Sequence, residues 1–275
     1  MRTDTFLSEG QYYGCCNPSR KAAFLVLSES TYAPGVRIPR HAHENPYFIF
    51  TLSGGQEEAF DTRTRTYLPS TLAFHPAGEI HSETVGAKGM RCLHVEFRAE
   101  WIERHTEVSR FLENASHFQG GRFGWLAHRI YREFYCMDDV APAAIEGLVL
   151  EILAEASRFR LQDSPGERPR WLIQARDLIH ARFAEPISLS DVATAVGIHP
   201  VRLARAFRSE YRSSVGEFIR QIRIESACRA MLSGDLPLTQ VGLSAGFADQ
   251  AHFARTFKRI IGMTPGQFRG ARRAG

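Results

Sequence analysis

Two stretches in the last third of the chain repeat each other: residues 189–198 read LSDVATAVGI and residues 238–247 read LTQVGLSAGF. Leucine, valine and glycine recur at an offset of 49 residues, and LARAFR at 203–208 then matches FARTFK at 253–258 at an offset of 50. In each copy a short apolar helix stops at a glycine, the residue that most readily takes the left-handed conformation at a helix end. A second amphipathic helix follows, so the repeat predicts two helix-turn-helix motifs within about the last 105 residues.

The helix ends of both copies carry residues that suit them. Ser188 and Asp191 have the spacing of a capping box, Pro200 suits a first helical turn, and Asp249 suits an N-cap. Between the copies, residues 215–232 read as one helix, about 25 Å long at 1.5 Å per residue. With its flanking turns, this helix is expected to hold two recognition helices about 34 Å apart, which is one turn of DNA.

The second helix of each copy has one apolar and one polar face. At about 100° per residue, Leu203 and Phe207 point inward in the first copy, and Phe253 and Phe257 do so in the second. Arginine can pair with two acceptors of guanine and glutamine with adenine, so the outward faces predict base recognition in the major groove. The outward face is expected to present Val201, Arg205, Arg208 and Arg212 in the first copy and Ala251, Arg255, Lys258 and Arg259 in the second, where Gln250 and His252 lie near the N-terminal end of the helix.

Charge is distributed unevenly along the chain. The net charge is +4, but residues 168–275 hold 17 Lys+Arg and 8 Asp+Glu, a net +9, whereas residues 1–167 carry −5. A basic domain suits a polyanion because contacts to phosphates release counterions. The alternative is a helical bundle whose repeat is purely structural. The basic outward faces, the glycine turns and the spacer length together favour a partner that is double-stranded DNA.

From about residue 171 to 269, the chain resembles the AraC family of transcription regulators. The resemblance rests on residues 246–247 (GF), 253–258 (FARTFK) and 262–269 (GMTPGQFR). It implies base contacts from Val201, Ala204, Arg205, Gln250, Ala251, His252 and Arg255. Together with Arg202, Arg208 and Lys258, these residues form the predicted DNA-binding set.

The two motifs are expected to contribute unequally to specificity. Gly242 stands where the family usually has alanine, and a glycine inside a helix costs up to about 1 kcal/mol relative to alanine. We therefore expect a looser second motif. In the first motif, Val201 and Ala204 are apolar and suit a thymine methyl group, which leaves Arg205 as the main hydrogen-bonding reader.

The N-terminal part of the chain reads as short strands. Residues 23–27, 47–52, 71–75 and 91–97 are rich in β-branched, aromatic or alternating residues. Many short strands at close spacing favour a barrel or jelly roll. Turn-forming clusters separate the strands at residues 33–35, 53–55 and 75–78.

Two patterns in this part resemble the motifs of cupin barrels: Gly35-x5-His41-x-His43-x3-Tyr47-x6-Gly54 and Pro76-x-Gly78-x2-His81. In metal-binding cupins, three histidines and a glutamate converge inside the barrel, and Tyr47 stands here in the place of that glutamate. Three histidines can hold a divalent metal, so metal binding stays open. The preferred interpretation is an effector pocket lined by His41, His43, Tyr47 and His81. His94 and Glu96 share one face of a late strand, and the sequence leaves open which face looks inward.

Helical spacing replaces the strand pattern from about residue 107 to 160, with two helices joined at 138–142, and 162–169 reads as a linker. The predicted fold class is therefore α+β and multidomain. The predicted domains are a cupin-like β-barrel sensor (1–106), a helical linker and dimerisation region (107–162), and an all-α DNA-binding domain with two helix-turn-helix motifs (168–275).

The composition and the cysteine spacing indicate where the protein is located and whether its cysteines are reduced. A hydrophobic fraction of 44% and a charged fraction of 23% are typical of a soluble globular protein. No apolar run approaches the roughly 18 residues of a membrane span, and the first ten residues lack a signal core. We therefore expect a cytoplasmic protein without a membrane partner. The five cysteines, among them Cys15 and Cys16, have no disulfide or zinc spacing and are expected to be reduced thiols.

These observations predict a sequence-specific transcription regulator that acts as a homodimer and is controlled by a small-molecule effector in the barrel. It is expected to need no cofactor and not to be an enzyme. The alternative is a metal-dependent cupin enzyme or a metal sensor fused to a DNA-binding module. A third option is a regulator without an effector, controlled by its abundance or by a protein partner.

Overall fold

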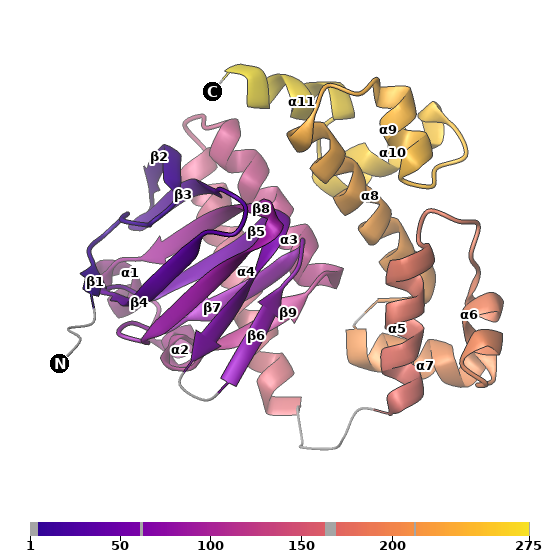
Figure 1. Ribbon diagram of the computed structural model, residues 1–275, viewed down its shortest axis with the longest axis horizontal. Coiled ribbons are helices and arrows are strands. Elements are labelled where there is room, and N and C mark those ends of the chain that lie inside the picture. Colours follow the sequence, from indigo (N-terminus) through magenta and orange to yellow (C-terminus); the bar gives the residue numbers. More distant parts are fainter. Residues whose placement is uncertain (1–4, 61–62, 163–168, 212, 275) are drawn as a thin grey trace. The chain divides into compact units, whose positions relative to one another are not determined.

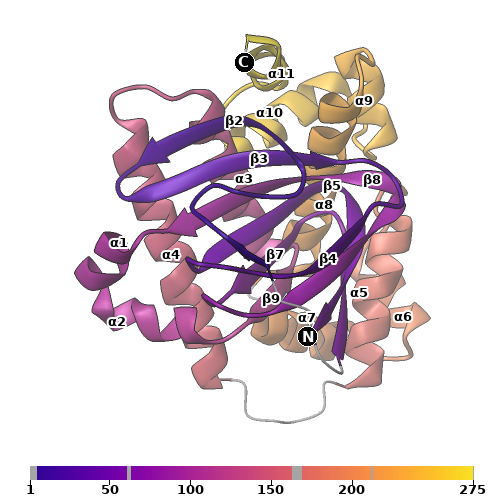
Figure 2. The same ribbon diagram turned by 60° about the vertical axis from the view of Figure 1, so that its left-hand side comes forward.

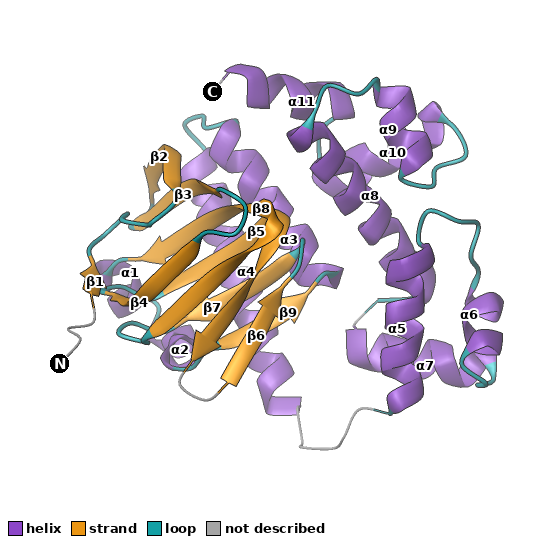
Figure 3. Cartoon of the chain, in the orientation of Figure 1, coloured by secondary structure: helices purple, strands orange, loops and turns teal. Residues whose placement is uncertain are grey.

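The computed structural model describes residues 5–60, 63–162, 169–211 and 213–274 (Figure 1). The chain folds as two units, one made of Met1–Gln119 and Leu126–Leu161, and one made of Gly120–Trp125 and Gln162–Ala274. The first unit contains the whole sheet and the second is helical (Figure 3), as the predicted fold class requires. Most of the predicted linker, residues 163–168, lies outside the described residues, as does Arg212.

The sheet of the first unit has nine strands, with the order β1-β4-β8-β5-β7-β9 along its main path. β3 pairs with β8 and carries β2 (Figure 2), and β6 pairs with β5. The strands are β1 (Thr5–Leu7), β2 (Cys15–Ala22), β3 (Leu25–Tyr32), β4 (Arg37–His43), β5 (Tyr47–Phe60), β6 (Arg63–Tyr67), β7 (Thr71–His75), β8 (His81–Phe97) and β9 (Ser116–Gln119).

β5 and β8 form the long antiparallel ladder of this unit, with Tyr47 opposite Glu96 at one end and Ala59 opposite Ser82 at the other. The register shifts between Thr51 and Ser53 and again between Gly54 and Gln56. These irregularities change which residues of β5 face inward. Side chains alternate between faces along a strand, yet odd-numbered residues such as Tyr47 line the interior before the shift and even-numbered residues such as Glu58 line it afterwards.

The predicted turn at residues 53–55 is therefore wrong: the chain continues through it as a bulged strand. The glycines allow this. Gly54 has φ of 72°, and a Cβ atom there would lie 1.8 Å from the carbonyl oxygen of Gly89. A glycine within a strand-like stretch can indicate a turn, but it can also indicate a bulge or a close approach of two backbones. Here it indicates a bulge and a close approach, and there is no turn at residues 53–55.

Two other strand boundaries differ from the expected ones. Ala23 and Phe24 have positive φ values of 47° and 63° and form the turn between β2 and β3, so β3 begins only at Leu25. The sheet also extends beyond residue 106, because β9 pairs with β7 through Ala73 opposite His117. A four-residue strand is too short to show its alternation among helical patterns.

Helices cover one face of this sheet (Figure 2). α3 (Gly121–Tyr135) and α4 (Ala141–Gln162) match the predicted helix pair and its connection. They follow the shorter segments α1 (Ala99–Arg104), α2 (Thr106–Ser109) and the 3-10 helix η1 (Arg110–Glu113). The α3 residue His128 packs edge-on against Phe50 of β5, with ring centroids 4.8 Å apart. The outer face of the ladder is thus an apolar layer against α3.

One buried carboxylate connects the sheet to α3. Glu29 on β3 is 2% exposed and accepts hydrogen bonds from Arg91 Nε at 3.0 Å and from the Tyr131 hydroxyl at 3.1 Å. The Tyr135 hydroxyl also donates to it. A buried charge is stable only when it is paired and hydrogen-bonded, and Glu29 meets that condition.

The second unit contains seven helices of its own among the residues described. The first four of these helices share a core that includes Leu203, Phe207 and Phe218, each fully buried. The helices are α5 (Arg170–Arg182), α6 (Leu189–Ala195), α7 (Pro200–Tyr211), α8 (Val215–Ser233), α9 (Leu238–Ser244), α10 (Gln250–Ile261) and α11 (Pro265–Ala274).

The sequence repeat is also a repeat of backbone hydrogen bonds. The Ile198 amide donates to the Ala193 carbonyl at 2.9 Å, and 49 residues later the Phe247 amide donates to the Gly242 carbonyl at 3.0 Å. The glycine at each turn is left-handed, with φ of 68° at Gly197 and 86° at the corresponding position of the second copy. This is the Schellman arrangement that ends a helix, and it confirms the predicted glycine turns.

The predicted helix starts are confirmed as well. Ser188 and Asp191 form a reciprocal capping box on α6, and the Asp249 carboxylate accepts the His252 amide at 2.6 Å to cap α10. A second capping box, between Ser214 and Glu217, begins α8.

The packing of α9 against α10 explains why residue 242 is a glycine. A Cβ atom at this position of α9 would lie 3.0 Å from the ring of Phe253, which is fully buried on α10. The glycine therefore lets the two helices of the second motif approach each other closely. The low helix propensity of Gly242 is therefore offset by the close packing of the Phe253 ring.

Among the described side chains, Cys15, Cys92, Cys136 and Cys228 are free thiols, while the side chain of Cys16 is not among those described. Within the described part of the chain, no helix is long and apolar enough to cross a membrane.

Gly54→Ala is expected to lower the free energy of unfolding by at least about 3 kcal/mol, because it adds left-handed strain of about 1–2 kcal/mol to a steric clash with Gly89. Gly35→Ala is the matched control: Gly35 also has positive φ, of 71°, but a Cβ atom there meets nothing within 4 Å. It should show only the strain. Denaturant unfolding of both variants measures the difference, and equal losses would contradict the close approach at the bulge.

His180 on α5 should make the helical unit less stable in acid. Its Nε2 is buried without a hydrogen-bond partner among the described residues, and burial lowers its pKa to about 4. The unfolded chain, with a pKa near 6.5, takes up the proton first as the pH falls. The free energy of unfolding should therefore drop between pH 6.5 and 4, by about 1–2 kcal/mol at pH 5. His180→Leu should remove this share of the pH dependence in denaturant unfolding, and identical pH profiles would contradict the assignment.

Candidate DNA-binding surface and barrel site

α7 presents an exposed edge that contains most of the predicted first reading set. Val201 is 60% exposed, and Arg205 and Arg208 are exposed, while Leu203 and Phe207 on the opposite side are buried. The predicted amphipathic division of this helix is therefore present. An exposed apolar Val201 beside basic residues suits a surface that meets the methyl groups and phosphates of DNA.

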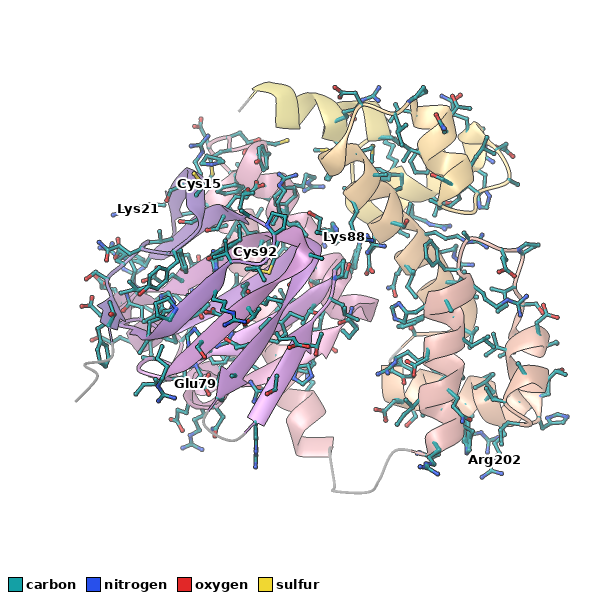
Figure 4. All side chains as sticks on the ribbon, in the orientation of Figure 1. Cys15, Lys21, Glu79, Lys88, Cys92 and Arg202 are labelled. Carbon is teal, nitrogen blue, oxygen red and sulfur yellow. The ribbon has the colours of Figure 1, made fainter. Side chains whose placement is uncertain are left out.

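Arg202 and Ala204 are placed differently from their neighbours on α7. The Arg202 side chain is exposed (Figure 4), and its guanidinium lies 5.6 Å from the ring centroid of Trp171 on α5. This cation–π contact holds the side chain near the helix start. Ala204 is half-buried, so only part of its surface lies on the outward edge.

α10 carries the second predicted set, and four of its five residues are exposed: Gln250, Ala251, Arg255 and Lys258. His252 is half-buried, with its ring edge-on to Phe247 at a centroid distance of 5.3 Å. Because this ring packs against the turn of the motif, His252 is both a structural residue and a candidate reader.

α8 joins the two motifs and is braced against the first. It has 19 residues, which at 1.5 Å each span about 28 Å. Arg223 on α8 donates to the carbonyl oxygens of Phe183 at 2.7 Å and Glu185 at 2.8 Å, at the end of α5. These bonds satisfy carbonyl groups that a helix end leaves open. The connection between the two reading helices is thus a single helix that is capped at its N-terminus and braced against the end of α5.

Comparison with known proteins agrees with this geometry. The helix-turn-helix domain family matches residues 192–271. Over 153 residues the chain is 24% identical to a putative AraC-like transcription regulator of Streptomyces antibioticus, covering 53% of this chain and 50% of that protein. The C-terminal part of the chain is an AraC-type helix-turn-helix domain.

Other relatives of this AraC-type domain are regulators by name. The HTH-type transcriptional regulator ArgR of Pseudomonas aeruginosa is 28% identical over 140 residues, which are 50% of this chain and 43% of that protein. A solved AraC-type regulator structure from Chromobacterium violaceum is 27% identical, covers 37% of this chain and 91% of that one, and has a TM-score of 0.36. The chain spans about half or less of the length of these curated relatives.

In the first unit, the four predicted pocket residues come together. The register places His41 of β4 opposite His81 of β8, and their ring centroids are 4.4 Å apart. His43 lies 5.1 Å from His41 and 4.5 Å from Tyr47 by ring centroids. All three histidines are buried.

Tyr47 occupies the position of the cupin glutamate and acts as a hydrogen-bond donor. The His81 Nδ1–H donates to the carbonyl oxygen of Glu79 at 2.9 Å, so its Nε2 is an acceptor, and the Tyr47 hydroxyl lies 3.2 Å from that Nε2. A phenol in this place supplies no carboxylate. The residues of the cupin motif alone therefore form a three-histidine cluster without the acidic ligand.

Other ionisable residues, not predicted from the sequence, face the same interior. Of the predicted residues, His41, His43 and Tyr47 line the pocket, whereas His81 does not. Glu58, His75, Glu83 and His94 line it as well, and its volume, taken as space open to the centre of a water molecule, is about 10 Å³. Such a space holds about one water molecule or one ion. His75 lies directly before the predicted Pro76-x-Gly78 motif, which was the available signal, whereas nothing near Glu58 distinguished it from Glu57.

The open question about His94 and Glu96 is answered by the N-terminal segment. Tyr12 stacks on His94 with ring centroids 3.7 Å apart, and the Gly10 amide and the Asn45 side chain donate to Glu96 at 2.8 Å and 2.9 Å. Both side chains face inward, and the segment between β1 and β2 covers them.

Burial keeps this interior uncharged. Desolvation lowers the pKa of His75 to about 3 and that of His81 to about 2, so both imidazoles are neutral near pH 7. Burial also raises the pKa of Glu83 to about 8 and raises the pKa of Glu58. Neutral imidazoles are the form in which histidine binds metals.

Proposed function

We propose that this protein is a sequence-specific DNA-binding transcription regulator that is controlled by a small effector in its barrel. The observation that carries the proposal is the paired arrangement of α7 and α10: each follows a glycine turn, buries an aromatic face and exposes arginine on the opposite edge. The basic net charge of residues 168–275 supports the same partner.

The contacts divide by chemistry. Arg205 and Arg255 are the residues proposed to grip guanine through two acceptors, and Gln250 suits adenine. Arg208 and Lys258 lie farther along the same helices, where contacts to phosphate position the protein without reading sequence. Each proposed contact uses a side chain that the structure leaves exposed.

The effector is proposed to act by favouring one conformation of the regulator over another, since a ligand shifts an equilibrium only through a difference in affinity. The pocket that includes His41, His43 and Tyr47 is the proposed binding place. Residues 107–162, which contain α3 and α4, are the proposed dimerisation region, and sedimentation equilibrium of the full chain tests that part separately.

Arg205→Ala and Arg255→Ala should each weaken binding to the native operator by about 1–3 kcal/mol and relax the preference at one base position. The operator is first obtained by genome-wide footprinting, and binding is then measured at one fixed salt concentration. Arg182→Ala is the control, because Arg182 is exposed at the end of α5 and its side chain pairs with Glu185. If both reading variants bind as tightly as the control, the placement of the recognition helices is wrong.

The two half-sites should contribute unequally. α10 offers Gln250 and Arg255 as polar readers, whereas α7 offers mainly Arg205 beside Val201 and Ala204. Single base-pair substitutions across the operator should therefore cost more affinity in the half-site bound by α10, at about 1–3 kcal/mol each for the important positions. Equal sensitivity of both half-sites in such a scan would contradict this.

A further inference from the structure

Three ligand atoms converge beside the predicted pocket residues from different strands. Oε1 of Glu58 on β5 lies 3.6 Å from Nε2 of His75 on β7 and 3.8 Å from Nε2 of His81 on β8. The three side chains are buried, at 1% exposure or less, and their ligand atoms all lie within 4.8 Å of one another. With metal–ligand distances of about 2.0–2.2 Å, the two separations between Glu58 and the histidines are within a few tenths of an ångström of those that one ion needs.

The Glu58 oxygen that faces this centre has no hydrogen-bond partner among the described residues. A buried polar atom left without a partner costs roughly 1–3 kcal/mol, and more when it is charged. The nearest imidazole nitrogens, Nε2 of His75 and Nε2 of His81, lie 3.6 Å and 3.8 Å from this oxygen, which is beyond hydrogen-bonding distance. A cation that binds Glu58 in its deprotonated form would satisfy Oε1.

Glu58 and His81 are each held by the protein through their other polar atom. The Tyr67 hydroxyl donates to Oε2 of Glu58, and the carbonyl oxygen of Glu79 accepts the His81 Nδ1–H at 2.9 Å. Outer contacts of this kind orient metal ligands and fix the histidine tautomer. The Glu79 carboxylate lies 3.3 Å from Nδ1 of His75 without a hydrogen bond between them, and Nε2 of His75 lies 3.5 Å from the Tyr67 hydroxyl.

We propose that Glu58, His75 and His81 bind one divalent first-row transition metal ion inside the barrel. Two imidazoles and one carboxylate suit Zn²⁺, Fe²⁺, Co²⁺ or Ni²⁺ and leave coordination positions for water. The small cavity beside them accommodates an ion or a water molecule.

The overlapping cluster His41, His43 and His81 is a different set, and the two compete. Both require Nε2 of His81, because its Nδ1 is engaged with Glu79, and one lone pair binds one ion. The set with Glu58 contains a carboxylate ligand of its own, whereas the three-histidine set contains only imidazoles and has Glu83 beside it, with Oε1 3.5 Å from Nε2 of His81. A carboxylate that ligates the ion directly compensates its charge within the ligand set, and this favours Glu58 and His75.

Tyr47 opposes metal binding at this site. Its hydroxyl donates to Nε2 of His81 at 3.2 Å, so an ion must displace that hydrogen bond. Its ring stacks on His75 at a centroid distance of 4.6 Å, and phenylalanine would preserve that contact. Tyr47→Phe should therefore bind the ion at least as tightly as the wild type.

The proposal that these residues bind a metal ion is independent of the proposed function. The further step, that this ion is the effector of the regulator, rests on that function. The test uses the full chain, freed of affinity tag and metal. Zn²⁺ stoichiometry is measured by elemental analysis after dialysis, and Co²⁺ affinity by its visible absorption. We expect one ion per chain, and at least a 100-fold loss of affinity in Glu58→Gln, His75→Gln and His81→Gln.

Two controls separate this site from its surroundings. His94→Gln alters a buried pocket histidine outside both ligand clusters, and His43→Gln alters only the competing set; both should keep affinity within a few-fold of the wild type. Thermal unfolding without metal checks that each variant folds, and Zn²⁺ should raise the unfolding temperature of wild type and Tyr47→Phe but not of Glu58→Gln.

The proposal is overturned if the folded wild-type chain binds no stoichiometric ion, or if His43→Gln abolishes binding while Glu58→Gln keeps it. Binding to the operator fragment with and without Zn²⁺ is measured in parallel. Operator binding without any metal site would leave the proposed function standing, and a metal site without operator binding would leave only the present inference.

Discussion

The interior of the barrel depends on the antiparallel pairing of β5 with β8. This ladder sets Ile49 opposite His94 and, beyond the bulge, Glu58 opposite Glu83. Because side chains alternate along a strand, a slip of one residue would turn each inward set to the other face. The bulge makes such a change once, within β5, and Gly54 permits it by passing close to the carbonyl of Gly89.

The neighbouring strands complete the same inner layer. β7 places His75 opposite Tyr47, and β4 places His41 opposite His81. Ionisable side chains from four strands thus share one desolvated space, in which burial lowers the pKa values of the histidines and raises those of Glu58 and Glu83. A buried cluster of imidazole and carboxyl groups is unfavourable for an isolated charge, but it offers a cation several ligands at once. This is the physical link between the fold of this unit and its proposed ligand.

The helical unit was far more predictable than the barrel. Its helix starts at Ser188 and Asp249 and its turn at Gly197 depend on hydrogen bonds and dihedral angles within a few residues, so local sequence specifies them. The barrel histidines His41 and His81 were found through motif spacing. Glu58 was missed because its inward orientation arises from the bulge, and β9 was missed because its pairing partner β7 lies more than 40 residues earlier.

The sequence by itself determined the two helix-turn-helix motifs, the exposed arginines on their second helices, and the presence of several histidines in a strand-rich N-terminal unit. Only the tertiary structure decided which carboxylate joins those histidines and why Gly242 faces Phe253. The physical reason is range: caps, turns and helix faces are set by neighbours three to five residues apart, whereas the register of long strands and the approach of two helices are set by contacts between distant segments.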